Sequence, residues 1–124
     1  MKLDSLIDFI ESQVPYTYFK NRIPKESVDD CASVKLTGGF PTRDTGIKQP
    51  SFQILVRGAN TPEGWSESEN IANQLYESLT NLEEVMIGEY SVVAIRCMNS
   101  VPLFLGTDEN DRPIYSLNFS MIVR

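Results

Sequence analysis

The chain has 124 residues, of which 41% are hydrophobic and 23% charged, values typical of a single globular domain. This composition excludes a chain that is disordered throughout, and the length is sufficient for a core that needs no disulfide or metal. Seventeen acidic against eleven basic side chains give a net charge of −6, which argues against a general nucleic-acid-binding protein, because such proteins carry a basic surface.

The first half of the chain predicts one helix and two strands. Apolar residues at helical spacing predict an amphipathic helix over 3–14, which Pro15 ends. A short extended segment is expected over 16–19, and alternation predicts a half-buried strand over 28–36. Alternating Phe52, Ile54 and Val56 predict a central strand. The Gly- and Pro-rich stretch 38–50 between these strands is expected to be a long loop, and such loops are usually functional.

The second half predicts one helix followed by strands. Leucines and other apolar residues on one face predict a helix over 63–82, with either Thr61 or Ser66 as its N-cap. Glu83 and Glu84 are interpreted as surface charges at the end of this helix. Tyr90 to Met98 is apolar on both faces, which predicts a central strand or a face used by a partner. The apolar segment 101–105 continues or restarts this strand.

The last strand has the clearest alternation. Five apolar residues face one way: Tyr115, Leu117, Phe119, Met121 and Val123. The polar segment 106–113 before it predicts a hairpin turn. The expected fold is therefore α+β, with a single mixed, mainly antiparallel β-sheet flanked by two α-helices, and one domain over 1–124.

No signal peptide or membrane span is expected, because two aspartates interrupt the apolar N-terminus and no apolar run approaches 18 residues. Cys31 and Cys97 are 66 positions apart without a C-x-x-C pattern. We expect two buried, reduced thiols and synthesis in the cytoplasm.

Catalytic chemistry has little support in the sequence. The chain contains no histidine, which removes the commonest general base and the usual serine and cysteine triads. Gly38-Gly39 lacks the surroundings of a phosphate-binding loop. The acidic run from Asp108 to Asp111 fails the EF-hand spacing, because Pro113 stands at loop position 6 and Phe119 at position 12. We expect no catalytic residue, metal or cofactor, and interpret the chain as a structural protein.

Several short motifs resemble those of phage minor capsid and tail terminator proteins from phages of Gram-positive hosts. They are Gly38-Gly39-Phe40-Pro41, then Gln49-Pro50-Ser51-Phe52-Gln53-Ile54-Leu55-Val56-Arg57, the helical Ala72-Asn73-Gln74-Leu75-Tyr76, and Pro102 to Pro113 followed by Tyr115-Ser116-Leu117-Asn118-Phe119. In that family, a G-x-D-x-x-x-R turn leads into a strand of the N-F type. The resemblance covers nearly the whole chain.

The resemblance implies a homo-hexameric ring at the head-proximal end of the tail tube. Such a ring would end tube polymerisation and join the tail to the head. Its partners would be other copies of itself, the tail tube protein and head-completion or neck proteins, while DNA passes through without specific binding. The protein would be assembled in the host cytoplasm and end in the tail or neck of the virion. Two alternatives stay open: another neck protein (a head-closure or tail-completion factor) or a small intracellular binding or regulatory domain.

Three groups of residues are candidates for these contacts. The first is the 38–50 loop, with Phe40, Arg43, Asp44 and Lys48, which we expect to reach a neighbouring subunit or the tube. The second is Arg57, which either pairs with a carboxylate at a subunit interface or is an ordinary arginine at the end of a strand. The third is the acidic excess, expected to line the DNA channel and to repel DNA; its members are Glu67, Glu69, Asp108, Glu109 and Asp111.

Overall fold

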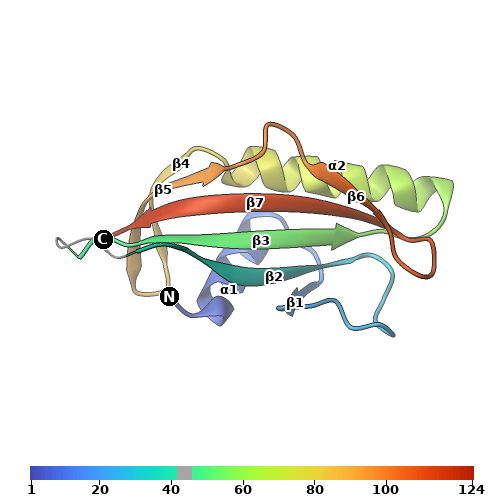
Figure 1. Cartoon of the computed structure of the whole chain (residues 1–124), viewed down its shortest axis with the longest axis horizontal. Helices are drawn as coiled ribbons and strands as arrows, with labels where there is room; N and C mark the ends of the chain where they lie inside the picture. Colours follow the sequence, from blue (N-terminus) through green and yellow to red (C-terminus); the bar gives the residue numbers. More distant parts are fainter. Residues whose placement is uncertain (42–45) are drawn as a thin grey trace.

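The computed structural model describes residues 1–41 and 46–124, which form two helices and one seven-stranded sheet (Figure 1). The elements in chain order are α1 (Leu3–Gln13), β1 (Tyr18–Lys20), β2 (Cys31–Phe40), β3 (Gln49–Arg57), α2 (Pro62–Leu79), β4 (Leu82–Ile87), β5 (Tyr90–Cys97), β6 (Leu103–Thr107) and β7 (Pro113–Val123). No helix among the described residues is long and apolar enough to cross a membrane.

The sheet is mixed and mainly antiparallel, with strands in the order β1-β2-β3-β7-β5-β4. Only β1 and β2 are parallel. β5 and β6 pair with the same edge of β7, one after the other. Cys97 at the end of β5 lies opposite Phe119, and Leu103 at the start of β6 lies opposite Ser116. β5 and β6 are therefore one strand interrupted at 98–102. This confirms the predicted restart, the hairpin before β7 and the α+β fold.

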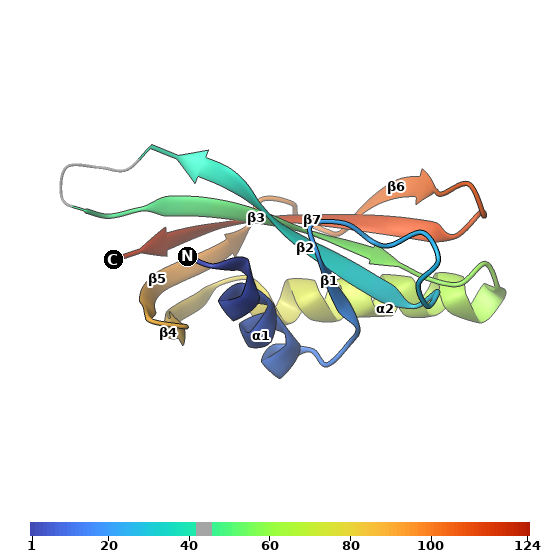
Figure 2. The same cartoon turned by 90° about the horizontal axis from the view of Figure 1, so that it is seen from below.

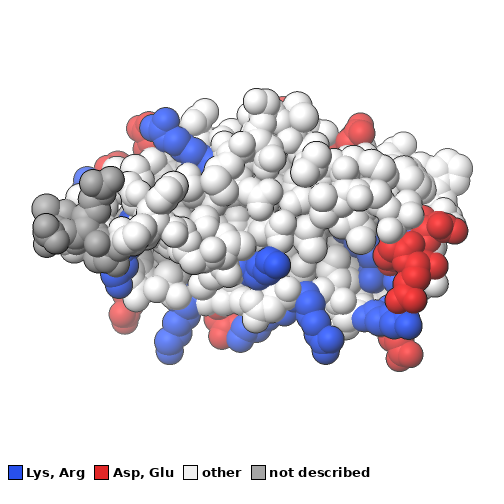
Figure 3. Space-filling model, in the orientation of Figure 1, with Lys and Arg blue, Asp and Glu red and all other residues white. Residues whose placement is uncertain are grey.

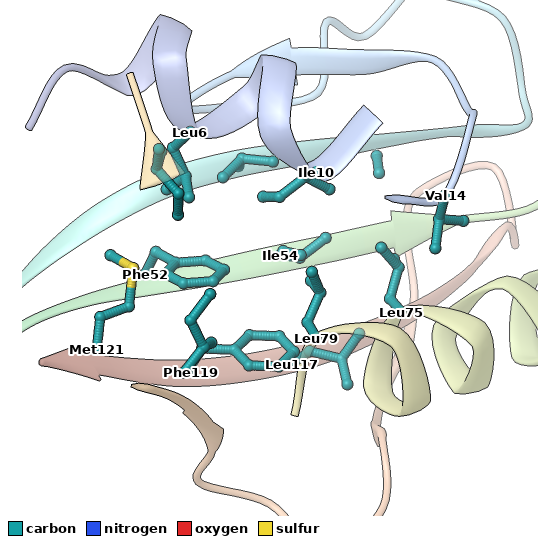
Figure 4. Packing of buried hydrophobic residues seen from close by; sticks show 14 of the residues in the cluster. Leu6, Ile10, Val14, Phe52, Ile54, Leu75, Leu79, Leu117, Phe119 and Met121 are labelled. Carbon is teal, nitrogen blue, oxygen red and sulfur yellow. The ribbon is translucent and has the colours of Figure 1, made fainter. Parts of the chain in front are cut away.

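Both helices cover the same face of the sheet, and the core lies between them and the strands (Figure 2). The alternating residues of β3 and β7 supply the sheet side of this core, including the stacked rings of Phe52 and Phe119. Leu6 and Ile10 of α1 and Leu75 of α2 pack against them and are fully buried (Figure 4). The predicted apolar faces of the helices and central strands therefore meet in one core.

The second helix is shorter than predicted. Thr61 is its N-cap, and the Thr61 hydroxyl accepts a hydrogen bond from the Gly64 N–H at 2.9 Å, with Pro62 in the first turn. The helix ends at Leu79, and the strand β4, which the sequence did not predict, pairs with β5. Glu83 and Glu84 consequently lie on a strand and not at a helix end. Pairing of β4 with β5, in which Glu83 lies opposite Ala94, outweighs the weak strand propensity of glutamate.

The structure places only the two ends of the predicted loop 38–50 in strands, 38–40 in β2 and 49–50 in β3. β2 begins at Cys31, later than predicted, and continues through the two glycines to Phe40, while β3 starts at Gln49. A register shift between Leu36 and Gly38 keeps the two strands paired to their ends. The two glycines that suggest a loop, Gly38 and Gly39, are thus part of the paired strands of a β2–β3 hairpin.

Candidate assembly surfaces

The β2–β3 hairpin depends on glycine at a close approach between its strands. Gly39 has φ +105°, and a Cβ there would collide with the carbonyl oxygen of Gln49. Any side chain at this position would clash with the backbone of the opposite strand. Beside the start of β3, Lys48 and Val123 exchange two backbone hydrogen bonds of 2.9 and 2.8 Å. The hairpin is therefore anchored to the end of β7.

Two of the four residues predicted to make contacts from this region are described. Phe40 ends β2 and is 67% exposed, and Lys48 is exposed beside the start of β3. Arg43 and Asp44 lie outside the described residues. The hairpin therefore presents a large apolar ring and a cation to the outside of the chain.

Arg57 is buried inside its own chain, with only 3% of its surface exposed. Its guanidinium donates to the carbonyl of Val28 at 2.7 Å, to the hydroxyl of Ser27 at 3.0 Å and to the carbonyl of Asp29 at 3.3 Å. The carboxylate of Asp108 is 4.0 Å away. Because these donors are satisfied internally, Arg57 fixes the segment before β2 and is not placed to pair across an interface.

A second buried arginine, Arg112, completes this cluster; it is the arginine of the G-x-D-x-x-x-R turn, and the sequence predicted no role for it. Its side chain contacts Asp108 at 2.7 Å and Asp29 at 3.1 Å. Burial would raise the pKa of Asp108, but hydrogen bonds from the Arg112 and Asn110 N–H groups and from the Arg112 guanidinium outweigh it and lower that pKa. The arginine cluster, defined as Arg57, Arg112, Asp29 and Asp108, joins the segment before β2 to the turn before β7.

The five predicted channel carboxylates fall into two groups. Glu67 and Glu69 lie on α2, and the Tyr115 hydroxyl donates a hydrogen bond of 3.1 Å to the carboxylate of Glu69. Burial first, and then this bond to Glu69, raise the pKa of Tyr115. Asp108, Glu109 and Asp111 lie in the turn between β6 and β7, where Asp108 belongs to the arginine cluster. Only Glu67, Glu109 and Asp111 are both exposed and without a buried partner among the described residues.

A group of exposed apolar side chains surrounds β6, and the sequence did not mark it as a site. This apolar strip consists of Trp65, Met98, Val101, Leu103, Phe104 and Leu105, which are between 37% and 67% exposed. Trp65 of α2 lies against Phe104, with 5.6 Å between ring centroids, and Phe104 lies 5.3 Å from Tyr115. The strip therefore wraps the edge of the sheet from its open face to its helix-covered face.

One sequence signal could have revealed the strip. The eleven residues from 97 to 107 contain no Asp, Glu, Lys or Arg, although the whole chain is 23% charged. Edge strands normally carry charges that prevent unwanted pairing. An uncharged apolar edge of this length is typical of a contact surface rather than of a simple surface strand.

Charge is concentrated at the margins of the open sheet face. Figure 3 shows this face, which is mostly uncharged, with carboxylates at one end and basic side chains along one edge. Its strands present small polar side chains, and Gln53 donates to the hydroxyl of Ser116 at 3.0 Å. Neighbouring molecules would meet little electrostatic repulsion across this surface.

The two thiols and the acidic groups show no arrangement for chemistry among the described residues. Burial raises the pKa of both Cys31 and Cys97, so both thiols stay protonated at neutral pH and are weak nucleophiles. Both are free thiols; Cys31 is buried, as predicted, whereas Cys97 is only half-buried and the prediction of burial is wrong there. No group of three potential metal ligands is found in residues 1–41 and 46–124.

The chain matches a known protein family over nearly its whole length. Residues 4–124 match the family described as bacteriophage tail terminator protein. The chain belongs to this family. It is therefore a structural, tail-related component of the virion, and it works in contact with other structural proteins of the particle. This confirms the family resemblance derived from the motifs.

The fold of this tail terminator family member also occurs in a solved particle. A chain from the virion of a native gene transfer agent particle superimposes with a TM-score of 0.62 at 14% identity. The match covers 92% of this chain and 83% of the other, so the two share a fold. No curated protein matches the chain.

Proposed function

We propose that this protein forms a closed ring at the head-proximal end of the phage tail tube. The ring ends tube polymerisation and joins the tail to the head through neck proteins. The observation that carries this proposal is the family match over residues 4–124. Six copies per ring is the number that the motif resemblance implies.

Ring closure places a specific demand on the subunit. A ring built from one kind of chain needs two different surfaces that fit each other, because each copy contacts its two neighbours through opposite sides. The chain has two candidate surfaces of this kind: the hairpin with Phe40 and Lys48, and the apolar strip around β6. This supports a ring over a symmetric dimer.

The acidic turn provides a surface for the DNA path. Glu109 and Asp111 are exposed in the turn between β6 and β7, which lies at one end of the molecule (Figure 1). Carboxylates that face DNA repel its phosphates and prevent adhesion. Replacing both residues by lysine should slow DNA release from assembled particles and leave particle assembly unchanged. Unaltered release kinetics would show that another surface lines the path.

Tube capping is tested with purified tail tube protein. Polymerisation in the presence of this chain should give shorter tubes, with added density at one end only, as measured by electron microscopy. A protein of similar size and charge serves as the control and should leave tube length unchanged. Tubes of equal length without end density would contradict the proposal. Binding to isolated heads instead of tubes would identify a head-closure factor.

A further inference from the structure

The apolar strip belongs to a strand whose outer edge is open. Within the part of the chain that the structure describes, β6 pairs with β7 alone. Its outer backbone groups therefore have no strand partner, and Leu103, Phe104 and Leu105 stand exposed along it. An edge that is both unpaired and apolar favours the addition of a strand from another molecule.

A second open edge lies on the other side of the same sheet. β1 pairs only with Ala32, Ser33 and Val34, so residues 35–40 of β2 have no outer neighbour among the described residues. This half of β2 ends in the exposed Phe40 and carries the exposed Lys35. Figure 1 shows it and β6 toward opposite ends of the molecule.

Resting on the proposed ring, we propose that the apolar strip binds the 35–40 edge of β2 from a second copy of this chain. The sheet then continues from copy to copy, with Phe40 of one subunit packed on the Trp65–Phe104 pair of the next. The two edges lie on opposite sides of one sheet, so each subunit uses a different surface toward each neighbour. This is the head-to-tail geometry that closes a ring.

Charge favours this pairing over a symmetric one. Glu69 lies beside the aromatic end of the strip, where its carboxylate accepts a hydrogen bond from Tyr115. The 35–40 edge carries Lys35, and the hairpin carries Lys48. Hairpin against strip therefore brings opposite charges together. Two strips facing each other would bring like charges together, and both 35–40 edges would stay unpaired.

Two double variants separate the two surfaces. Leu103→Glu with Leu105→Glu disables the strip, and Lys35→Glu with Phe40→Glu disables the edge. All four side chains are exposed, so both variants keep the core intact. Each alone should associate on the order of a hundredfold more weakly than wild type, because a charge replaces a buried leucine or phenylalanine at the interface. Sedimentation and native mass spectrometry measure the assembled mass.

Mixing the two variants gives the decisive readout. Each variant keeps the surface that the other lacks, so the mixture should form a species of twice the chain mass and nothing larger. This dimer also shows that both variants are folded. The control is Met86→Glu, which alters an exposed apolar residue on the edge strand β4 and should assemble like wild type.

Each other outcome overturns the inference. Double variants that assemble like wild type, a mixture without the dimer, or a wild-type chain that stays monomeric at all concentrations would each do so. Loss of assembly in Met86→Glu alone would place the interface at β4. Tube capping is measured separately on tube length, so a chain that forms the predicted dimer but leaves tubes uncapped would refute only the proposed function.

Discussion

The arginine cluster and the apolar strip reverse the usual distribution of side chains. Arg57 and Arg112 are almost fully buried, although arginine is rarely buried. Leu103, Phe104 and Leu105 are about half exposed, although leucine and phenylalanine are usually buried. The chain hides charge at one place and exposes apolar surface at another, so the two regions serve different purposes.

The arginine cluster serves the fold. The segment between β1 and β2 has no helix or strand of its own, and Arg57 and Arg112 bind its residues 27–29 to the end of the sheet. Directional hydrogen bonds specify one position for this segment, which apolar contacts alone would specify less sharply. The apolar strip, in contrast, stays exposed in the folded chain and adds little to its stability.

The largest expected effect comes from breaking the arginine cluster. Arg57→Ala removes three internal hydrogen bonds and leaves the carbonyls of Val28 and Asp29 without this donor. We expect a loss of roughly 3 kcal/mol in the free energy of unfolding, measured by urea denaturation. The matched control is Arg96→Ala at an exposed position, which should change stability by about 0.5 kcal/mol or less. Equal effects of the two variants would mean that the cluster does not stabilise the fold.

A smaller effect is expected on the pH dependence of stability. The pKa of Asp108 is lower in the folded chain than its ordinary value of 3.8. Its ionised form therefore stabilises the fold above pH ~4, and this contribution is lost as the pH falls through the lowered folded pKa. Asp108→Asn should be less stable than wild type at pH 7, and the difference should shrink below pH ~4.

The control for this titration lies in the same turn. Asp111 is exposed and has φ +57°, a conformation that asparagine tolerates. Asp111→Asn should follow the wild-type curve of unfolding free energy against pH. A parallel curve for Asp108→Asn would show that the acid loss of stability has another origin.

The sequence predicted the apolar core and failed where polar residues depend on distant partners. Alternation placed Phe52 and Leu117 in the core because side chains on a strand repeat every two residues. Arg57 was assigned to a subunit interface or to an exposed strand end, because its actual partners lie about 30 positions away and no local pattern indicates them. β4 was missed because Glu83 and Glu84 are poor strand residues, and only pairing with β5 makes them a strand.

Only part of the candidate site was predicted, because the rest also depends on partners that are distant in the sequence. The hairpin was marked by its glycines and by Phe40, although the sequence started the loop at Gly38, where the structure still has paired strands. The strip was read as a strand only, because apolar residues at 101–105 fit a buried strand equally well. Exposure depends on which strand lies beside β6, and local periodicity carries no information about that neighbour.

The smallest effect on stability is expected in the strip itself. Leu105→Ser should change the free energy of unfolding by about 0.5 kcal/mol or less, because the side chain is 54% exposed. The control Leu117→Ala in the adjacent strand β7 should cost roughly 2–5 kcal/mol, because Leu117 is fully buried. Urea denaturation of dilute monomer measures both. A loss from Leu105→Ser near that of Leu117→Ala would mean that the strip stabilises the subunit itself, and the contrast between the two regions would disappear.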